Sequence, residues 1–124
     1  SFTKGTSALL VAMLTAAESL GLSDELASEL AFSQAETLNR ARASVPRLPS
    51  NAGRWIGEME EIAATFEASG VTPHLHQGAA EMFRLLTSTP FADESPETVD
   101  RSRTMADTIS VVAEHLPART EIGD

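Results

Sequence analysis

Residues 51–70, NAGRWIGEMEEIAATFEASG, decide the fold of this chain and contain its only tryptophan. Apolar side chains recur along them at the spacing of one helix face, and a helix with so apolar a face must bury it. These side chains are Trp55, Ile56, Met59, Ile62, Ala63 and Phe66. A charged stripe of Arg54, Glu58 and Glu61 borders the apolar one. The stretch therefore predicts a core helix whose charged edge faces either a cleft or water.

Helical periodicity also dominates the chain before this stretch. Residues 8–20 are apolar nearly all round, which is typical of a central helix packed on several sides, and Gly21 is placed to end that helix. A second helix is expected over residues 23–43. Residues 45–50, VPRLPS, carry two prolines, and these predict an extended strap that leads into the central stretch.

Proline placement marks the two remaining helices. Thr72-Pro73 is a strong helix start, and the turn before it is so short that the new helix must run antiparallel to residues 51–70. Ser95-Pro96 predicts the start of the last helix by the same chemistry. No stretch shows strand alternation. We therefore expect one all-α domain over residues 1–124, with about five helices packed around a buried first helix.

Composition narrows the classes of partner. At 124 residues and 42% hydrophobic content the chain is large and apolar enough for a globular core. Its net charge of −9, without a cluster of basic residues, argues against nucleic acid and against an anionic membrane surface. The absence of cysteine excludes disulfides and thiol catalysis and fits a reducing compartment, so we expect a cytoplasmic protein.

Motifs for metal or nucleotide binding are missing from the sequence. His74 and His76 are two residues apart, so on a helix they point about 200° apart and cannot share an ion. His115 is far away in sequence, and we expect no metal site. Neither a Walker motif nor G-x-G-x-x-G nor G-x-S-x-G occurs. A nucleotide cofactor would therefore bind mostly outside these residues.

Arg54 is the first candidate binding residue. It falls in the first turn of the predicted helix, where a positive charge opposes the helix dipole. Arg before Glu is also the less favourable order for an i,i+4 pair, so Glu58 is a poor local partner. A ligand carboxylate held by two hydrogen bonds explains an arginine in such a position. A solvated charged face is the simpler alternative.

Lys4 is the second candidate. Together with Thr3, Gly5 and Thr6 it places a cation and two hydroxyls beside a glycine, where a ligand or a second helix has access to the backbone. Its charge opposes the dipole of a helix that starts at Thr3, which leads us to expect that the helix begins upstream of Ser1, the first residue of the sequence given. An exposed lysine near a frayed end is the simpler alternative.

Three segments together resemble a known pattern. They are FTKGTSALL at 2–10, RWIGEMEEIA at 54–63, and GVTP at 70–73 followed by GAAE at 78–81. The pattern is similar to the C-terminal helical domain of NAD-binding, 6-phosphogluconate-dehydrogenase-like proteins of the β-hydroxyacid dehydrogenase superfamily. The segment at 54–63 is the most specific of the three, and the resemblance covers roughly residues 1–90.

This resemblance implies a function and a set of partners. It implies an upstream Rossmann domain that binds NAD or NADP, a small anionic hydroxy acid as substrate, and a homodimer. The catalytic lysine of such proteins is expected upstream of Ser1, about two turns before Lys4, so no catalytic residue is assigned in this chain. Lys4 and Arg54 are then expected to bind the substrate carboxylate or phosphate, with Glu58 orienting Arg54. The chain by itself would be inactive.

A hypothesis from a different class remains open. The same sequence suits a non-catalytic helical interaction or dimerisation module, whose acidic surface serves only solubility. The two hypotheses differ in where Lys4 and Arg54 point. Convergence of both side chains on one site between the first helix and the helix at 51–70 favours the dehydrogenase, and divergence removes these residue assignments.

Overall fold

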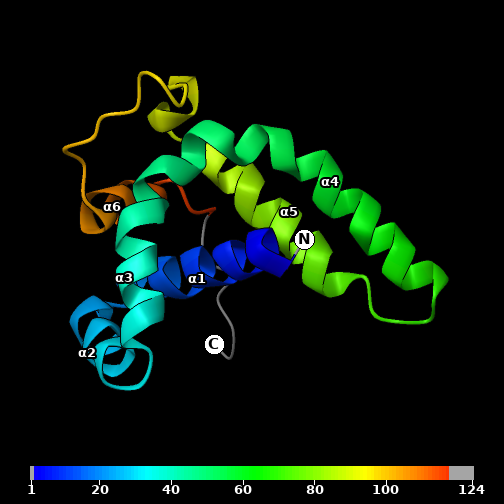
Figure 1. The fold of residues 1–124 in the computed structure, drawn as a ribbon, viewed down its shortest axis with the longest axis horizontal. Helices are drawn as coiled ribbons and strands as arrows, with labels where there is room; N and C mark the ends of the chain where they lie inside the picture. The colour runs from blue at the N-terminus through cyan, green and yellow to red at the C-terminus, as the bar shows by residue number, and fades with distance from the viewer. Residues whose placement is uncertain (1, 118–124) are drawn as a thin grey trace.

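The chain is described by a computed structural model over residues 2–117, and these residues contain helices and no strand (Figure 1). The all-α prediction is therefore confirmed. In chain order the elements are α1 (Phe2–Ser19), α2 (Ser23–Ser33), α3 (Ala35–Ser44), the short 3-10 helix η1 (Val45–Arg47), α4 (Leu48–Ala68), α5 (His74–Thr87), the 3-10 helix η2 (Pro90–Asp93) and α6 (Met105–Glu114).

Helices α4 and α5 lie side by side as a hairpin, as Figure 1 shows. The predicted apolar stripe of α4 faces α5, with Met59 fully buried and Trp55 packed edge-on against the buried Phe83 of α5, at a ring-centroid distance of 5.5 Å. An ion pair of 2.6 Å between Glu60 and Arg84 closes the outer edge of the hairpin. The antiparallel pairing expected from the short turn is confirmed.

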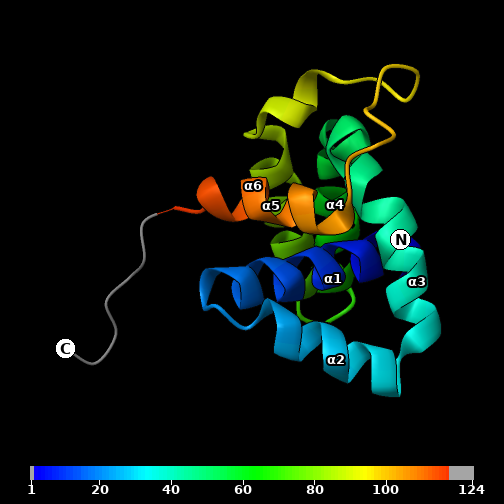
Figure 2. The same cartoon turned by 90° about the vertical axis from the view of Figure 1, so that its left-hand side faces the viewer.

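Helix α1 packs between α6 on one side and α2 on the other, and it also contacts α5 (Figure 2). Its side chains Ala8, Val11 and Leu14 are buried in the common core. The opposite face is not covered, since Phe2 is 85% and Leu9 is 60% exposed. Three helices therefore pack on α1, as expected for a helix packed on several sides, and only the face with Phe2 and Leu9 is left exposed among the described residues.

The expectation about the start of the first helix concerns Ser1 and the chain before it. Ser1 lies outside the described residues, and the first helical residue among them is Phe2. The upstream beginning of this helix therefore stays a prediction.

Two glycines end helices in the left-handed region. Gly21 has φ 73° after α1 and Gly70 has φ 87° after α4. In each case the amide N–H of the following residue reaches back to the carbonyl of the helix, with Leu22 donating to Ala17 and Val71 donating to Phe66. This is the Schellman arrangement, which residues with a Cβ adopt at a cost. The predicted helix ends at Gly21 and Gly70 are confirmed.

The expected second helix over 23–43 is two helices. Gln34, with φ −143° and ψ 50°, interrupts it between α2 and α3. The hydroxyl of Ser33 donates to the carbonyl of Glu29, a side-chain bond that competes with the helix ladder. The break lets Leu30 and Leu38 both reach the core although the two helices run in different directions (Figure 2).

The prediction that residues 45–50 are extended is wrong. Val45–Arg47 forms the 3-10 helix η1, and α4 begins directly afterwards at Leu48. Pro46 and Pro49 each lie in the first turn of a helix, where proline costs no hydrogen bond because the first N–H groups have no intrahelical partner. Both prolines therefore start helices here and do not straighten the chain.

The predicted start of the last helix at Ser95-Pro96 is also wrong. Helix α6 begins only at Met105, after a capping box in which Thr104 and Asp107 bond reciprocally through side chain and backbone. The amide N–H of Thr98 and that of Val99 donate to the carbonyl of Ser95, so the proline opens a turn that does not continue. The carboxylate of Glu94 and the side chain of Arg103 hold this segment in place, as described below.

Substitution of a core leucine in α5 tests this packing. Leu86 is 1% exposed, and Leu86→Ala should lower the free energy of unfolding by about 2–5 kcal/mol, because it removes buried methyl groups and leaves a cavity. Leu75 in the same helix is 69% exposed, and Leu75→Ala should change the free energy of unfolding by less than about 0.5 kcal/mol. Urea denaturation measures both, and equal losses would contradict the assignment of the core.

Candidate functional site

Lys4 is the only lysine of the chain, and the structure brings it to α4. Its ammonium donates to the Glu58 carboxylate with an Nζ–Oε2 distance of 2.5 Å, across 54 positions of sequence. The same nitrogen lies 5.3 Å from the centroid of the Trp55 ring, within the range of a cation–π contact. Lys4 is thus fixed between a carboxylate and an aromatic face, and the exposed-terminus alternative does not describe it.

Arg54 lies one helical turn before Glu58 on α4 and is exposed. Because α4 begins at Leu48, Arg54 is the seventh residue of the helix, so the prediction that it lies in the first turn is wrong, and with it the argument from the helix dipole. Its guanidinium donates to the side-chain oxygen of Asn51. Among the described residues Glu58 pairs with Lys4 and not with Arg54, so the expected orienting role of Glu58 toward Arg54 is not seen. Because Asn51 is a neutral partner, no ion pair among residues 2–117 neutralises the positive charge of Arg54.

The pairing changes the acidity of Glu58. The hydrogen bond from Lys4 lowers the pKa of Glu58 below its usual range, with a smaller contribution from the positive charge itself and an opposing one from desolvation. Glu61, the third member of the predicted charged stripe, is exposed. The structure therefore assembles Lys4, Glu58 and Trp55 and leaves Arg54 at the edge, without a described partner shared by Lys4 and Arg54.

The catalytic lysine that the resemblance implies has no counterpart in this site. It is expected upstream of Ser1, and both Ser1 and that position lie outside the described residues. Since Lys4 is the chain's single lysine, no second lysine of this chain can take that role. The upstream lysine stays a prediction, and Lys4 keeps only the binding role expected for it.

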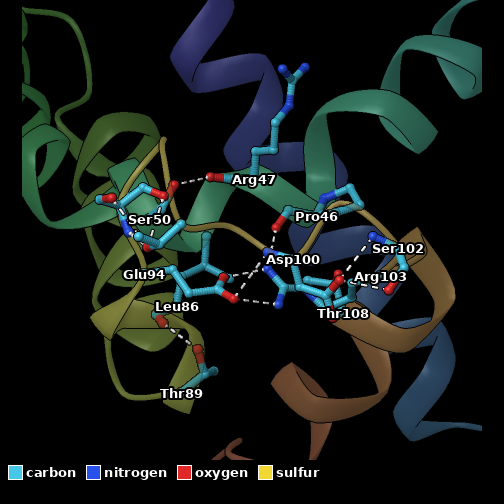
Figure 3. A network of polar contacts seen from close by, with 12 residues as sticks. Pro46, Arg47, Ser50, Leu86, Thr89, Glu94, Asp100, Ser102, Arg103 and Thr108 are labelled. Carbon is cyan, nitrogen blue, oxygen red and sulfur yellow. Dashed lines mark hydrogen bonds and ion pairs between the residues drawn. The ribbon is translucent and has the colours of Figure 1, made fainter.

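The most buried ion pair among the described residues joins Arg103 and Glu94, and the sequence analysis did not predict it. Arg103 donates through Nη2 and Nη1 to both oxygens of Glu94, at 2.6 and 3.0 Å (Figure 3). Nη2 also donates to the carbonyl oxygen of Pro46 at 2.7 Å, and the guanidinium stacks 3.8 Å from the Phe91 ring centroid. The backbone N–H of Asp100 donates to Glu94 as well.

Arg103, Glu94 and the carbonyl group of Pro46 together form what we call the clamp. The Arg103 side chain is 6% exposed, and its hydrogen bonds tie the segment between α5 and α6 to the 3-10 helix that precedes α4. Its hydrogen bonds lower the pKa of Glu94 as well. The guanidinium is buried and both of its Nη atoms already donate, so it is not available to a ligand, although its Nε has no hydrogen-bond partner among the described residues. No spacing rule links residues 46, 94 and 103, so the sequence carried no signal for it.

A cavity of about 630 Å³ lies between α1 and α5. Its walls are mostly apolar and come from the uncovered face of α1, the first turns of α5 and the end of α4. None of Lys4, Arg54 and Glu58 lines it. His76 does, and the Nδ1 atom of its ring is buried without a hydrogen-bond partner among the described residues.

Neither a metal-binding cluster nor a membrane-spanning helix occurs among residues 2–117. Across residues 2–117 no group of three or more His, Cys, Asp or Glu side chains is placed to hold a metal ion. His74 bonds to Gln77 at 3.0 Å, while His76 packs on Phe66, so the two neighbouring histidines face different partners. In the same part of the chain, every helix is too short or too polar to cross a membrane.

Comparison with known proteins gives one family. The profile described as Domain of unknown function (DUF1932) matches residues 17–86, more than half of the chain. The match runs from the end of α1 through nearly all of α5 and includes Arg54, Trp55 and Glu58, whereas Lys4 lies before it. No curated protein and no solved structure gives a significant match.

The Lys4–Glu58 pair predicts at which pH the carboxyl group of Glu58 titrates. The carboxyl carbon of Glu58 should titrate by NMR at a pH below the ordinary glutamate value, and Lys4→Met should move the midpoint up toward that value. Since the folded-state pKa is lowered, the stabilisation from this pair is present above the ordinary carboxyl pKa and is lost as the pH falls through the lowered one. An unchanged midpoint in Lys4→Met would contradict the pairing.

The clamp predicts that substitution of Arg103 lowers the free energy of unfolding. Arg103→Met removes one partner of a buried pair and leaves Glu94 and the Pro46 carbonyl without it, so unfolding at pH 7 should become easier by about 2–4 kcal/mol. The exposed Arg101 is the control, and Arg101→Met should have an effect below about 0.5 kcal/mol. Because the pKa of Glu94 is lowered, the difference between wild type and Arg103→Met should shrink below about pH 4.5. Equal effects of the two substitutions in urea would contradict the clamp.

Proposed function

We propose, from the premise that this chain belongs to the DUF1932 family, that it is the helical C-terminal domain of an NAD(P)-dependent oxidoreductase that acts on a β-hydroxy acid. Domains of this family are associated with the C-terminal region of NAD-binding dehydrogenase-like proteins. The matched residues include the segment 54–63, which carries the most specific part of the resemblance described above. The all-helical fold agrees with such a domain.

One observation carries the proposal: the meeting of Lys4 and Glu58. Two segments that the resemblance assigns to substrate binding, 54 positions apart, come into contact at 2.5 Å. The ammonium of Lys4 is kept at a defined place by the carboxylate and by the Trp55 ring. Arg54 adds a second cation whose partner is neutral. In the proposal, a substrate carboxylate or phosphate binds to these two cations, and Glu58 positions Lys4.

The described residues do not fit a nicotinamide cofactor. A dinucleotide site needs a strand that turns into a helix through a glycine-rich loop, and residues 2–117 contain neither a strand nor such a motif. The proposal therefore assigns NAD or NADP to a separate nucleotide-binding domain and gives this chain substrate binding and a homodimer contact. No residue of this chain is assigned as the catalytic base.

A single lysine makes the experiment direct. Reductive methylation with ¹³C labels the amine of Lys4 and the chain's α-amine, and NMR then follows each signal during titration with 6-phosphogluconate or 3-hydroxyisobutyrate at constant ionic strength. The Lys4 signal should shift in a saturable way, because an anion changes the surroundings of the ammonium. Arg54→Gln should weaken binding by about tenfold or more, since it removes a charged hydrogen bond.

Arg40 provides the matched control. It is an exposed arginine on α3, with a side chain that is 77% exposed, and Arg40→Gln should leave the affinity within about twofold. Titration with sodium sulfate reports the shift that any small anion causes. A Lys4 signal that never saturates, or equal losses in Arg54→Gln and Arg40→Gln, would refute substrate binding and favour the non-catalytic interaction module.

A further inference from the structure

We propose that the substrate anion displaces the Glu58 carboxylate from Lys4, and that the Trp55 ring then keeps the ammonium in place. The inference rests on the proposed function and concerns how that same site opens to its ligand. In the structure the ammonium of Lys4 already has a negative partner, since its Nζ lies 2.5 Å from Oε2 of Glu58. An anion that binds to Lys4 must therefore share the ammonium with Glu58 or take its place.

The contact that holds Glu58 is weak. The side chains of Lys4 and Glu58 are 31% and 41% exposed, and a pair that water reaches in this way changes an equilibrium by no more than about fivefold. Only Oε2 of the carboxylate accepts a hydrogen bond from Lys4, and the described residues provide no second donor to this carboxylate. The adjacent surface of α4 is open, because a Cβ at Gly57 would meet nothing within 4 Å. The carboxylate can therefore turn into water without losing another hydrogen bond.

The negative charge of Glu58 favours displacement over sharing. The hydrogen bond from Lys4 lowers the pKa of Glu58, so this carboxylate is ionised at neutral pH. Two anions on one ammonium would lie about 4–5 Å apart, where their repulsion is at least as large as the net gain from one exposed pair. Arg54 donates to the neutral Asn51 and not to Glu58, so no second cation holds the carboxylate in the site. Departure of Glu58 thus removes the repulsion at a small cost.

Trp55 is suited to hold the ammonium after Glu58 has left. Its ring centroid lies 5.3 Å from Nζ of Lys4, and an aromatic face attracts a cation although the ring carries no net charge. The ring therefore does not repel an incoming anion as a carboxylate does. It is itself fixed by the edge-on contact with the buried Phe83, at 5.5 Å between the ring centroids. Trp55 is thus a positioning residue, which acts through Lys4.

The clamp provides the contrast of a carboxylate that cannot leave. Both oxygens of Glu94 accept hydrogen bonds from Arg103, the backbone N–H of Asp100 donates to it as well, and its side chain is only 20% exposed. Glu58 has one hydrogen bond in place of these three and twice the exposure. Of the two carboxylates, Glu58 is therefore the one that a ligand can replace.

Glu58→Gln tests the displacement. Glutamine keeps the size of the side chain and can still accept a hydrogen bond from Lys4, but it carries no charge. Amide NMR of the unmodified chain, titrated with 6-phosphogluconate at neutral pH and constant ionic strength, measures the affinity. The variant should bind about three- to tenfold more tightly than wild type, because the competing charge is gone. Glu61→Gln removes the same charge from an exposed neighbour on α4 and should stay within about twofold of wild type.

Substitution of Trp55 tests the positioning role in the same titration. Trp55→Leu removes the aromatic face and should weaken the binding of 6-phosphogluconate by about two- to tenfold. Trp55→Phe keeps an aromatic face and should lose less than Trp55→Leu. Phe83→Leu is the control, because it loosens the packing of the Trp55 ring and leaves its face intact. It should lower the free energy of unfolding but leave the affinity within about twofold.

The possible failures separate this inference from the proposed function. If 6-phosphogluconate binds saturably and Glu58→Gln leaves its affinity unchanged or weakens it, Glu58 is not displaced and only this inference is overturned. Equal gains in Glu58→Gln and Glu61→Gln have the same meaning, since they reflect net charge alone. Equal losses in Trp55→Leu and Phe83→Leu would overturn the role of Trp55. The absence of saturable shifts in both wild type and Glu58→Gln would overturn the proposed function together with the inference.

Discussion

The burial of the apolar stripe of α4 against α5 is the contact on which the rest of the structure depends. Met59 and Phe83 are fully buried where the two helices meet, and the Trp55 ring extends that contact toward the first turn of α1. With this hairpin in place, α1 crosses α5 with Val11 and Leu14 in the core. Helix α6 then covers α1 from the other side through Ile109 and Val112.

Two ion pairs, Lys4–Glu58 and Arg103–Glu94, connect parts of this fold and have different physical roles. The Lys4–Glu58 pair is partly exposed, so water screens it and an anion can compete for the ammonium. The Arg103–Glu94 pair is largely buried and is completed by a backbone carbonyl, so breaking it is costly. The first pair therefore suits binding and the second suits the fixation of a segment. This contrast is the reason for assigning the proposed substrate contact to Lys4 and not to Arg103.

The sequence predicted those features that depend on local rules. The apolar stripe at 55–66, the hairpin and the glycine ends at 21 and 70 each follow from spacing or from one residue's conformational freedom. Features decided by tertiary contacts were predicted wrongly. Prolines at 46, 49 and 96 carry the same local signal, yet the first two start helices and the third opens a turn.

In the candidate site, too, some features follow from local spacing and others depend on tertiary contacts. Spacing placed Arg54 and Glu58 on one face of a helix, and this holds within α4, where the two lie one turn apart. That Glu58 pairs with Lys4, 54 positions earlier, depends on how α1 docks against the hairpin, which no local pattern contains. His76 appeared in the sequence only as a histidine too close to His74 to share a metal. Its buried, unpartnered nitrogen became visible once α1, α4 and α5 were assembled.

The central claim is that Lys4 and Arg54 bind the anionic group of a hydroxy acid. A crystal structure of the chain soaked with 6-phosphogluconate tests it most directly. The account predicts a carboxylate or phosphate oxygen within hydrogen-bond distance of both Lys4 Nζ and the Arg54 guanidinium, with Arg54 turned away from Asn51. Density for the ligand elsewhere, with the Lys4–Glu58 and Arg54–Asn51 contacts unchanged, would contradict it.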